Sequence, residues 1–306
     1  MKLSRDEIGK NRVFGHWMYY LKDGGGIHGK IKNWKEGDDH REPAFAPIFD
    51  QEVEGSDIVF DIGANIGYNA FMAAKHGCRV YAIEPDPRNV YLLERGVKRN
   101  EYEDLISIHE IGISDKTGPA NFHLAKATNL SSMTMTKHTN EVVYIDTMSL
   151  SMFSSRRRLI GSGKTPKVFI RMDIEGHEVE ALKGMYALLS RSFPCKIFME
   201  LHPQFYGEGH ELEPVLKKVL GFGFKTKYVI SAAVAQPDQF KRLGYYPHKV
   251  YDCGRFERGV YSDIKDGNMI ELCCKPHRQE FDYNMIKRSG ETYSDKIVRS
   301  VLLERS

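Results

Sequence analysis

The chain alternates short apolar runs with amphipathic segments, and this alternation constrains the fold more than any other feature of the sequence. Three apolar runs bounded by turn residues stand at 58–63, 79–85 and 105–113. The stretches between them, 68–76 and 87–100, carry their apolar residues at helical spacing. Strands and helices that alternate at this pitch are typical of parallel βαβ units. We therefore expect an α/β fold built on a mainly parallel sheet.

The second half of the chain repeats this pattern. Apolar runs that end in polar residues predict strands at 167–176 and 196–202. Apolar stripes at helical spacing predict helices at 179–189 and 212–220. The other segments are less regular: we expect strands at 121–125, 142–146, 223–231 and 268–274, and a loop at 151–166.

The ends of the chain differ in composition from its middle. Residues 1–41 are polar and glycine-rich, and we expect an N-terminal extension in which a hairpin or short strands pack on the main domain. That domain is predicted to span 42–276 and to begin with a short helix near Pro47. Residues 277–306 are charged and weakly periodic, which predicts a C-terminal appendage.

Composition excludes several classes of protein. The 306 residues are 41% hydrophobic, which is enough for a full core, and the 44 basic and 41 acidic side chains give a net charge of only +3. This balance gives no argument for nucleic acid or an anionic membrane as a partner. The five cysteines include no C-x-x-C pair, which disfavours a disulfide framework or a zinc site. No apolar run is long enough to span a bilayer and the N-terminus is polar, so we expect a cytoplasmic protein.

A glycine loop at the end of the first predicted strand is the clearest functional signal. It reads Asp61-Ile-Gly63-Ala-Asn65-Ile-Gly67 and opens a predicted helix. In open α/β sheets, ligands bind beyond the carboxyl ends of the strands. The D-x-G-x-x-x-G spacing suits a ligand with an amino-acid moiety better than a diphosphate. Glu84, at the end of the next strand, can accept hydrogen bonds from ribose hydroxyls. Together these features favour S-adenosylmethionine (SAM).

Two motifs extend this interpretation to a family. The motifs DIGANIG (61–67) and DIEGHEVEALKG (173–184) resemble those of the FkbM family of SAM-dependent methyltransferases. Their order and the predicted elements that carry them also match this family. The resemblance covers about residues 40–230. It implies the class I methyltransferase (Rossmann-like) fold, with a seven-stranded, mostly parallel sheet and helices on both faces. It also implies O-methylation of hydroxyls on sugars, polyketides or other natural products.

The resemblance also assigns residues to the cofactor. The methionine end of SAM would be lined by Asp61, Gly63, Asn65 and Gly67, and the ribose would be held by Glu84. The adenine would be bordered by the segment that starts at Glu110 and Ile111, and Asp173 would also contact the cofactor. This chain has Arg171 where the family usually has a lysine, and the two residue types are not interchangeable where geometry counts.

Polar residues that follow two neighbouring strands predict the catalytic group. Asp173, Glu175 and Glu178 follow one strand, and Glu200 and His202 end the next. Methyl transfer to a hydroxyl needs a base for its proton. We expect the base to be His202, because imidazole has the best unperturbed pKa for this task. Glu175 could serve instead if burial raises its pKa, and Asp173 is expected beside them. Capping of the helix explains Glu178 as well as function does. Mg²⁺ held by the carboxylates is an alternative that we do not favour, so no metal ligand is assigned.

Three functions remain open on the sequence alone. The leading one is methylation of a hydroxyl on a glycan or small metabolite. An RNA methyltransferase is the second, although the chain has no dense basic stripe with aromatic residues and nucleic acid is therefore disfavoured as a partner. A non-catalytic SAM-binding module is the third. Neither the acceptor nor the oligomeric state can be read from the sequence.

Overall fold

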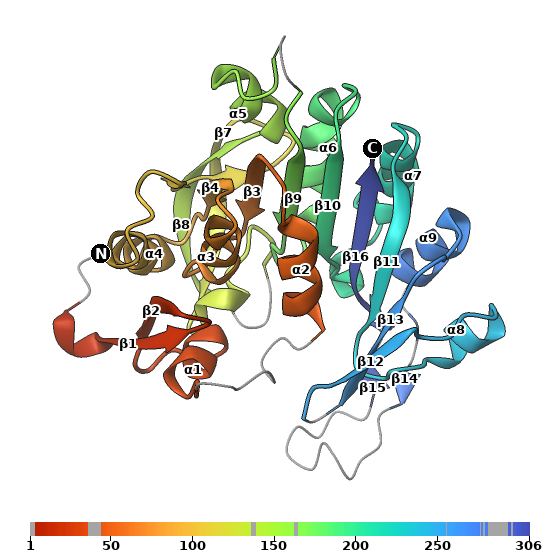
Figure 1. Cartoon of the computed structure of the whole chain (residues 1–306), viewed down its shortest axis with the longest axis horizontal. Coiled ribbons are helices and arrows are strands. Elements are labelled where there is room, and N and C mark those ends of the chain that lie inside the picture. Colours follow the sequence, from red (N-terminus) through yellow and green to blue (C-terminus); the bar gives the residue numbers. More distant parts are fainter. Residues whose placement is uncertain are drawn as a thin grey trace.

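The fold is built on one large mixed sheet. The computed structural model describes residues 4–35, 44–135, 139–161, 165–254, 256–275, 277, 279–280, 293–294 and 296–306. In this part of the chain, nine strands form a sheet with the order β12-β13-β11-β16-β10-β9-β3-β4-β5 (Figure 1). These strands are β3 (Ile58–Ile62), β4 (Arg79–Ile83), β5 (Ile106–His109), β9 (Val168–Met172), β10 (Cys195–Glu200), β11 (Lys225–Ser231), β12 (Lys249–Asp252), β13 (Glu257–Tyr261) and β16 (Val298–Arg305).

The α/β prediction is confirmed, and the number and direction of the strands are corrected. Strands β5, β4, β3, β9 and β10 run parallel, as the βαβ pattern predicts. Strand β16 runs antiparallel to both of its neighbours, β10 and β11. A further antiparallel hairpin, β12–β13, extends the sheet beyond β11. The sheet is therefore a mixed one of nine strands in the described part of the chain, instead of the seven expected.

Helices cover both faces of the sheet, because neighbouring residues of a strand point to opposite sides. Phe60 and Ile62 pack with α5, α6, α7 and α9 in one hydrophobic core. Val59, which directly precedes Phe60 in the sequence, packs with α2, α3 and α4 in the other. The helices are α1 (Ile27–Lys32), α2 (Phe45–Val53), α3 (Tyr68–Lys75), α4 (Pro87–Arg99), α5 (Leu150–Arg156), α6 (Glu178–Leu189), α7 (Leu212–Leu220), α8 (Asp238–Arg242) and α9 (Asp266–Cys274).

Smaller strand pairs lie outside the large sheet. The N-terminal segment forms the predicted hairpin, which packs on α4: Asn100 both accepts from the backbone N–H of Trp17 (2.8 Å) and donates to its carbonyl (2.9 Å). The hairpin consists of β1 (Ile8–Val13) and β2 (His16–Leu21). A three-stranded sheet is formed by β6 (Gly112–Ile113), β7 (Gly118–Ala125) and β8 (Thr139–Met148), and a short pair by β14 (Gln279–Glu280) and β15 (Tyr293–Ser294).

Three local expectations are wrong. The segment 151–166 was expected as a loop, but its first part continues α5, which Ser149 caps by accepting from the N–H of Met152. The segment 268–274 is helical (α9), because a short apolar run of this composition can bury one face as a helix as well as a strand. The end of the predicted appendage, 277–306, is the strand β16, which lies inside the sheet.

No helix of the described residues combines the length and the apolar character that crossing a bilayer demands.

Candidate functional site

The predicted site residues gather at one edge of the sheet. Ile62, Ile83 and Met172 end the parallel strands β3, β4 and β9 at the same level, and Met199 of β10 is in register with Met172. The polar residues that follow these strands therefore face a common space, as parallel neighbours must. The glycine loop, Glu84, Asp173, Glu175 and His202 are brought together there from four separate segments.

Backbone packing decides the role of Gly63 in the glycine loop. Its φ is +77°, in the left-handed region that favours glycine. A Cβ atom on Gly63 would lie 2.1 Å from the carbonyl oxygen of Asp173, at the end of the neighbouring strand. The close approach of the two strand ends therefore requires glycine at this position, whether or not a ligand also contacts it.

Two predicted cofactor residues lie behind this loop. Asp61 is fully buried, and its Oδ1 accepts from Nη1 of Arg171 at 3.4 Å. At Gly67, whose φ is +96°, a Cβ atom would lie 2.4 Å from Leu93 and 2.8 Å from Phe71. Asp61 and Gly67 therefore shape the loop from the core side and do not themselves border the cavities described below.

Arg171, the departure from the family pattern, links the loop to the next strand. Its guanidinium donates to the carbonyl of Gly63 (2.8 Å) and to Oδ2 of Asp173 (2.9 Å), besides its contact with Asp61. The side chain is buried, so these bonds are made away from bulk water and are stronger than surface pairs. Arg171 thus fixes the positions of both motifs relative to each other.

The first cavity lies between the glycine loop and the small sheet. It encloses about 520 Å³ of empty space, counting its open mouth, and such a size suits a small-molecule site. Its lining combines polar residues, among them Glu84 and Asp173, with apolar side chains. The lining residues are Ile62, Gly63, Asn65, Ile83, Glu84, Pro85, Ile111, Gly112, Ile113, Phe122, Thr128, Asn129, Ser131, Met133, Asp173, Ile174, Glu175 and His177.

Glu84 is held by the backbone around it. Its Oε2 accepts from the N–H of Asn65 (2.7 Å), and its Oε1 accepts from the N–H of Asp86 (2.9 Å) and from the side chain of Asn89 (3.3 Å). Burial and the nearby charge of Asp86 raise the pKa of Glu84 to about 7. Glu84 therefore has a structural role in joining the two loops, in addition to its place in the cavity wall.

The predicted adenine segment divides into two parts. Ile111 lines the first cavity, beside Ile113 and Phe122. Glu110 is exposed and is not among the lining residues. The apolar residues Phe122 and Met133, which come from the small sheet and the loop after it, were not singled out from the sequence, because nothing local shows that this hairpin folds over the strand ends.

A second cavity is also lined by the glycine loop and encloses about 850 Å³, again counting its mouth. It is lined by Gly26, Ile27, Lys30, Phe45, Gly63, Ala64, Asn65, Ile66, Tyr68, Asn69, Asn129, Arg171, Asp173, Glu175, Glu200 and Arg299. Gly63, Asn65, Asn129, Asp173 and Glu175 line both cavities. These shared residues mark the junction at which ligands in the two cavities would meet.

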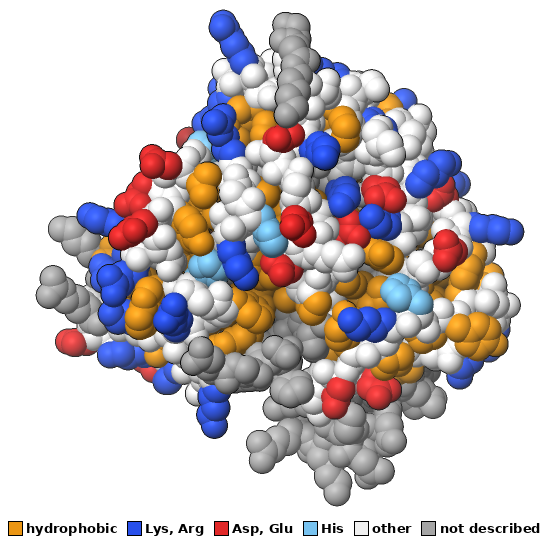
Figure 2. Space-filling view, in the orientation of Figure 1, with side chains coloured by type: hydrophobic (Ala, Val, Ile, Leu, Met, Phe, Trp, Pro, Cys, Tyr) orange, Lys and Arg blue, Asp and Glu red, His pale blue; other side chains and the backbone are white. Residues whose placement is uncertain are grey.

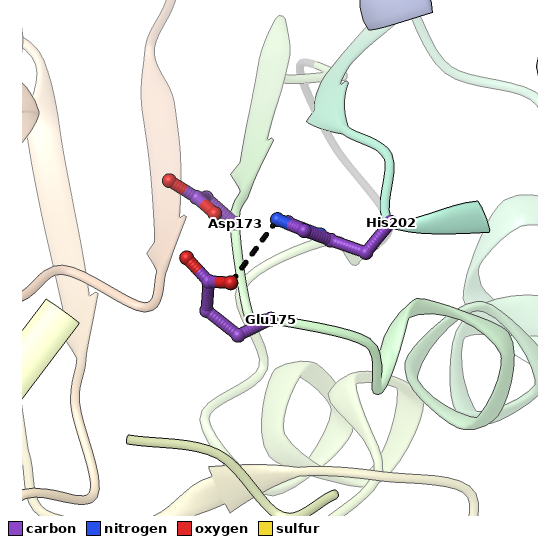
Figure 3. A group of neighbouring side chains, drawn as sticks. All are labelled: Asp173, Glu175 and His202. Carbon is purple, nitrogen blue, oxygen red and sulfur yellow. Dashed lines mark ion pairs between the residues drawn. The ribbon is translucent and has the colours of Figure 1, made fainter. Parts of the chain in front are cut away.

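Asp173 and Glu175 line both cavities. Figure 3 shows these two side chains beside His202. Oδ1 of Asp173 is buried without a hydrogen-bond partner among the described residues. Burial raises the pKa of Glu175 to about 7, with Asp173 and Glu200 adding to the effect and His202 opposing it. Burial and the charge of Glu200 also raise the pKa of Asp173. Glu175 can thus change its protonation state near neutral pH.

His202 is enclosed by carboxylates. It is 3% exposed, and its Nδ1 lies 2.8 Å from Oε1 of Glu178. Its Nε2 lies 3.3 Å from Glu175 and 3.4 Å from Glu200. Burial alone would lower its pKa, but the carboxylates of Glu178 and Glu200 raise it to about 10. His202 is therefore an imidazolium at neutral pH, which argues against the predicted role as a base.

Glu178 and Tyr206 hold His202 from behind. Glu178 is fully buried and accepts from the N–H of Gly176 (3.1 Å) and the hydroxyl of Tyr206 (3.0 Å). The hydroxyl of Tyr206 in turn accepts from the N–H of His202 (3.0 Å). Glu178 thus belongs to a buried hydrogen-bond network, in addition to its position in the first turn of α6. Nothing in the local sequence around Tyr206 predicts that it joins this network.

Two cations from the end of the chain complete the site. Lys296 donates to Oε1 of Glu200 at 3.1 Å, and Arg299 pairs with the same oxygen. Burial would raise the pKa of Glu200, but these two cations hold it well below its usual range. Neither cation was predicted from the sequence, because their segment was expected to form an appendage.

One group of side chains has the composition of a metal site. Asp173, Glu175 and His202 offer ligand atoms that lie within 4.8 Å of one another. A metal would require His202 to lose the proton that Glu178 and Glu200 stabilise, and neutral imidazole is the form that binds metals. Arg171 already occupies the second oxygen of Asp173. The electrostatics thus favour protons over a divalent cation at this position.

Comparison with known proteins identifies the family. The model of the methyltransferase FkbM domain matches residues 61–226. The hexuronic acid methyltransferase AglP of Haloferax volcanii is 29% identical over 171 residues, which are 55% of this chain and 66% of that protein, so the chain covers slightly less than two thirds of this relative.

The comparison with solved structures also returned matches. A methyltransferase FkbM from Methylobacillus flagellatus KT is 20% identical, with a TM-score of 0.39 over 68% of this chain and 43% of that one. TYW2 from M. jannaschii in complex with AdoMet is 12% identical, with a TM-score of 0.40 over 100% of this chain and 90% of that one. Since the family model spans more than half of the sequence and includes both motifs, the chain belongs to the FkbM methyltransferase domain family.

Proposed function

We propose that the protein is a SAM-dependent O-methyltransferase that acts on a hydroxyl of a glycan or small metabolite. The observation that carries this proposal is the position of Glu175, a carboxylate with a pKa of about 7, at the junction of the two cavities. The first cavity would take the cofactor and the second would take the acceptor. Glu175 would then stand where the reacting groups meet.

The residues present fit SAM in the first cavity. Glu84 lies in its wall, held by the backbone N–H groups of Asn65 and Asp86, and apolar residues including Ile111 and Phe122 offer a surface for an adenine ring. Asp173 Oδ1, buried without a partner among the described residues, is available to a donor of the ligand. Gly63 and Asn65 would border the amino-acid end, and Asp61 and Gly67 would support them from the core.

The mechanism needs a base and a fixed geometry. When bound, SAM would supply a methyl group on a sulfonium for transfer to the acceptor oxygen, with S-adenosylhomocysteine as the leaving product. Glu175 would take the hydroxyl proton on its carboxylate. His202, held as an imidazolium by Glu178, would orient Glu175 through the contact at 3.3 Å. Asp173, fixed by Arg171, would help to align the reactants.

The comparison with AglP supports a glycan as the acceptor. That relative is named for methyl transfer to a hexuronic acid, and its similarity extends over 55% of this chain. The second cavity, lined by both polar and charged side chains, has the character of a sugar site. We therefore place a sugar hydroxyl first among the acceptors to be tested.

The alternative of an RNA methyltransferase has less support. Basic and acidic side chains are interspersed on the face of the molecule in Figure 2, in keeping with a net charge of +3. Nucleic-acid sites instead concentrate Lys and Arg on one face. A non-catalytic SAM-binding module would have no need of the buried network that holds His202 against Glu175.

Two measurements test the proposed function. SAM binding is measured by calorimetry, and release of S-adenosylhomocysteine is then followed with a panel of sugars, glycosides and small hydroxylated metabolites, with transcribed RNA as a parallel substrate. We expect SAM to bind and a sugar or metabolite to be methylated. Turnover with RNA alone would contradict the proposal, as would a lack of SAM binding.

We expect Glu84→Ala to weaken SAM and also to destabilise the protein. Hydrogen bonds to a charged acceptor are worth about 1.5–3 kcal/mol each, so the Kd for SAM should rise about tenfold or more. The melting temperature should fall as well, because Asn65 and Asp86 lose the acceptor of their N–H groups. Calorimetry and thermal denaturation measure the two effects. The exposed Glu110 is the matched control: if Glu110→Ala weakens SAM as much, the assignment of Glu84 is wrong.

Turnover is expected to survive chelation. The proton on His202 and the bonds of Arg171 to Asp173 leave the cluster better suited to protons than to Mg²⁺. Activity of the dialysed enzyme with and without EDTA is the measurement, and added Mg²⁺ is the control. Loss of turnover on chelation that Mg²⁺ restores, with SAM still bound, would overturn the metal-free mechanism.

A further inference from the structure

The backbone of Glu175 has an unusual conformation. Its φ is +51°, in the left-handed region that residues with a side chain rarely adopt. A residue in this region is strained, and it stays there only where the surrounding structure holds it. Strained residues of this kind are concentrated at functional sites. Contacts from the rest of the fold must therefore keep Glu175 in this conformation.

The peptide group between Glu175 and Gly176 is held at both of its polar atoms. Its carbonyl oxygen accepts from the hydroxyl of Ser132 at 2.8 Å. Its N–H donates to Oε1 of the fully buried Glu178 at 3.1 Å. This peptide group cannot turn over without losing both hydrogen bonds. The two side chains therefore fix the backbone from which the carboxylate of Glu175 projects.

Ser132 is itself held firmly, although it lies 43 residues before Glu175 in the sequence. It is 1% exposed, and its backbone forms two hydrogen bonds with His123 of β7, of 2.8 and 3.0 Å. Its Oγ accepts from the N–H of Thr134 at 2.9 Å, so the hydroxyl keeps its hydrogen for a carbonyl. The carbonyl of Ile174 is farther away, at 3.4 Å. Ser132 is thus a fixed donor that is directed at the carbonyl of Glu175.

The neighbours of Ser132 belong to the wall of the first cavity. Ser131 and Met133 are among its lining residues, whereas Ser132 lines neither cavity. The segment that borders the proposed cofactor site is therefore bonded directly to the backbone of Glu175. Nothing in the local sequence predicts this contact, because the two residues are brought together only by the position of the small sheet.

We propose that Ser132 is a positioning residue for methyl transfer, which holds the backbone of Glu175 so that its carboxylate faces the junction of the two cavities. This inference rests on the proposed function, because it takes Glu175 as the base. The carboxylate itself is held by Nε2 of His202 at 3.3 Å. Without the hydroxyl of Ser132, Glu175 can relax from its strained conformation and move its carboxylate away from this position. Catalysis is sensitive to such small displacements of a reacting group.

Two crystal structures test the contact directly: those of the unchanged protein and of Ser132→Ala, each with S-adenosylhomocysteine. Alanine removes the hydroxyl and introduces no larger group. We expect Glu175 in the variant to leave the left-handed region and its carboxylate to lose contact with His202, while S-adenosylhomocysteine stays bound. A variant in which Glu175 keeps both its φ and this contact would overturn the inference.

Turnover separates positioning from a loss of stability. With the most active acceptor of the panel described above, Ser132→Ala should lower kcat about tenfold or more and leave the Kd for SAM nearly unchanged. Ser151 is the matched control: its hydroxyl donates to the carbonyl of Gly184 (2.7 Å) and accepts from the N–H of Leu188 (3.1 Å), and it lines neither cavity. Ser151→Ala should lower the melting temperature by a similar amount and keep kcat.

A double-mutant cycle tests whether Ser132 acts through Glu175. In the Glu175→Gln background the base is already absent, so Ser132→Ala should change the remaining turnover by less than about twofold. An equal loss of turnover in both backgrounds, or full activity of Ser132→Ala, contradicts the positioning role. If S-adenosylhomocysteine does not bind, or Glu175→Gln alone stays fully active, the proposed function fails and the inference fails with it. That result is visible before Ser132 is changed.

Discussion

Glu175→Gln is expected to lower turnover by about 100- to 10,000-fold, which is the usual contribution of a general base. The amide cannot take the hydroxyl proton, but it keeps the size of the side chain. The affinity for SAM should stay close to that of the unchanged enzyme. Release of S-adenosylhomocysteine with the best acceptor, together with calorimetry, separates the two effects.

The pH profile provides a second readout for the same residue. Burial raises the pKa of Glu175 to about 7, so the carboxylate is protonated below that pH and cannot act as a base. Turnover should therefore rise as the pH increases through about 7 and then level off. If Glu175→Gln keeps most of its activity while His202→Gln abolishes it with SAM still bound, the base is His202 and our assignment is wrong.

Deletion of residues 296–306 is expected to abolish folding. The strand β16 lies between β10 and β11 and places Val301, Leu302 and Leu303 in the two cores with no exposed surface. Each fully buried side chain of this kind contributes about 1.5–3 kcal/mol. A typical domain is stable by only about 5–15 kcal/mol in total. The deletion also leaves the hydrogen bonds of two strands unpaired inside the sheet.

Circular dichroism and the yield of monodisperse protein measure this effect. Removal of the exposed Ser306 alone is the matched control and should leave the melting temperature unchanged. A shortened chain that remains folded and binds SAM would show that the final segment is an appendage after all. Such a result would also remove Lys296 and Arg299 from the site.

Local patterns were sufficient for the parallel half of the sheet and for the glycine loop. The apolar spacing of each segment predicts β3, α3, β4 and α4. Gly63 and Gly67 have positive φ angles, which glycine adopts more easily than other residues. The positions of Glu84, Asp173 and Glu175 at strand ends follow from the same pattern. Parallel strands then bring these ends together without further information.

The segment from 266 to the C-terminus could not be predicted in this way. The run 268–274 is short enough to bury one face as a strand or as a helix, and only its packing against β11 and α7 selects the helix. In β16, Leu302 pairs with Phe198, about a hundred residues earlier. No local spacing records a partner at such a distance, so the charged residues around this strand suggested a tail.

The sequence by itself determined the family, the type of fold and the set of acids and histidine that gather at the strand ends, because these depend on local motifs and on the order of strands and helices. Only the tertiary structure decided the protonation of that set. His202 has the better ordinary pKa for a base, but the carboxylates of Glu178 and Glu200 outweigh the effect of burial and raise its pKa to about 10, and we therefore propose Glu175 as the base. A pKa depends on burial and on charges from the whole fold, including those on β16, and no short stretch of sequence contains them.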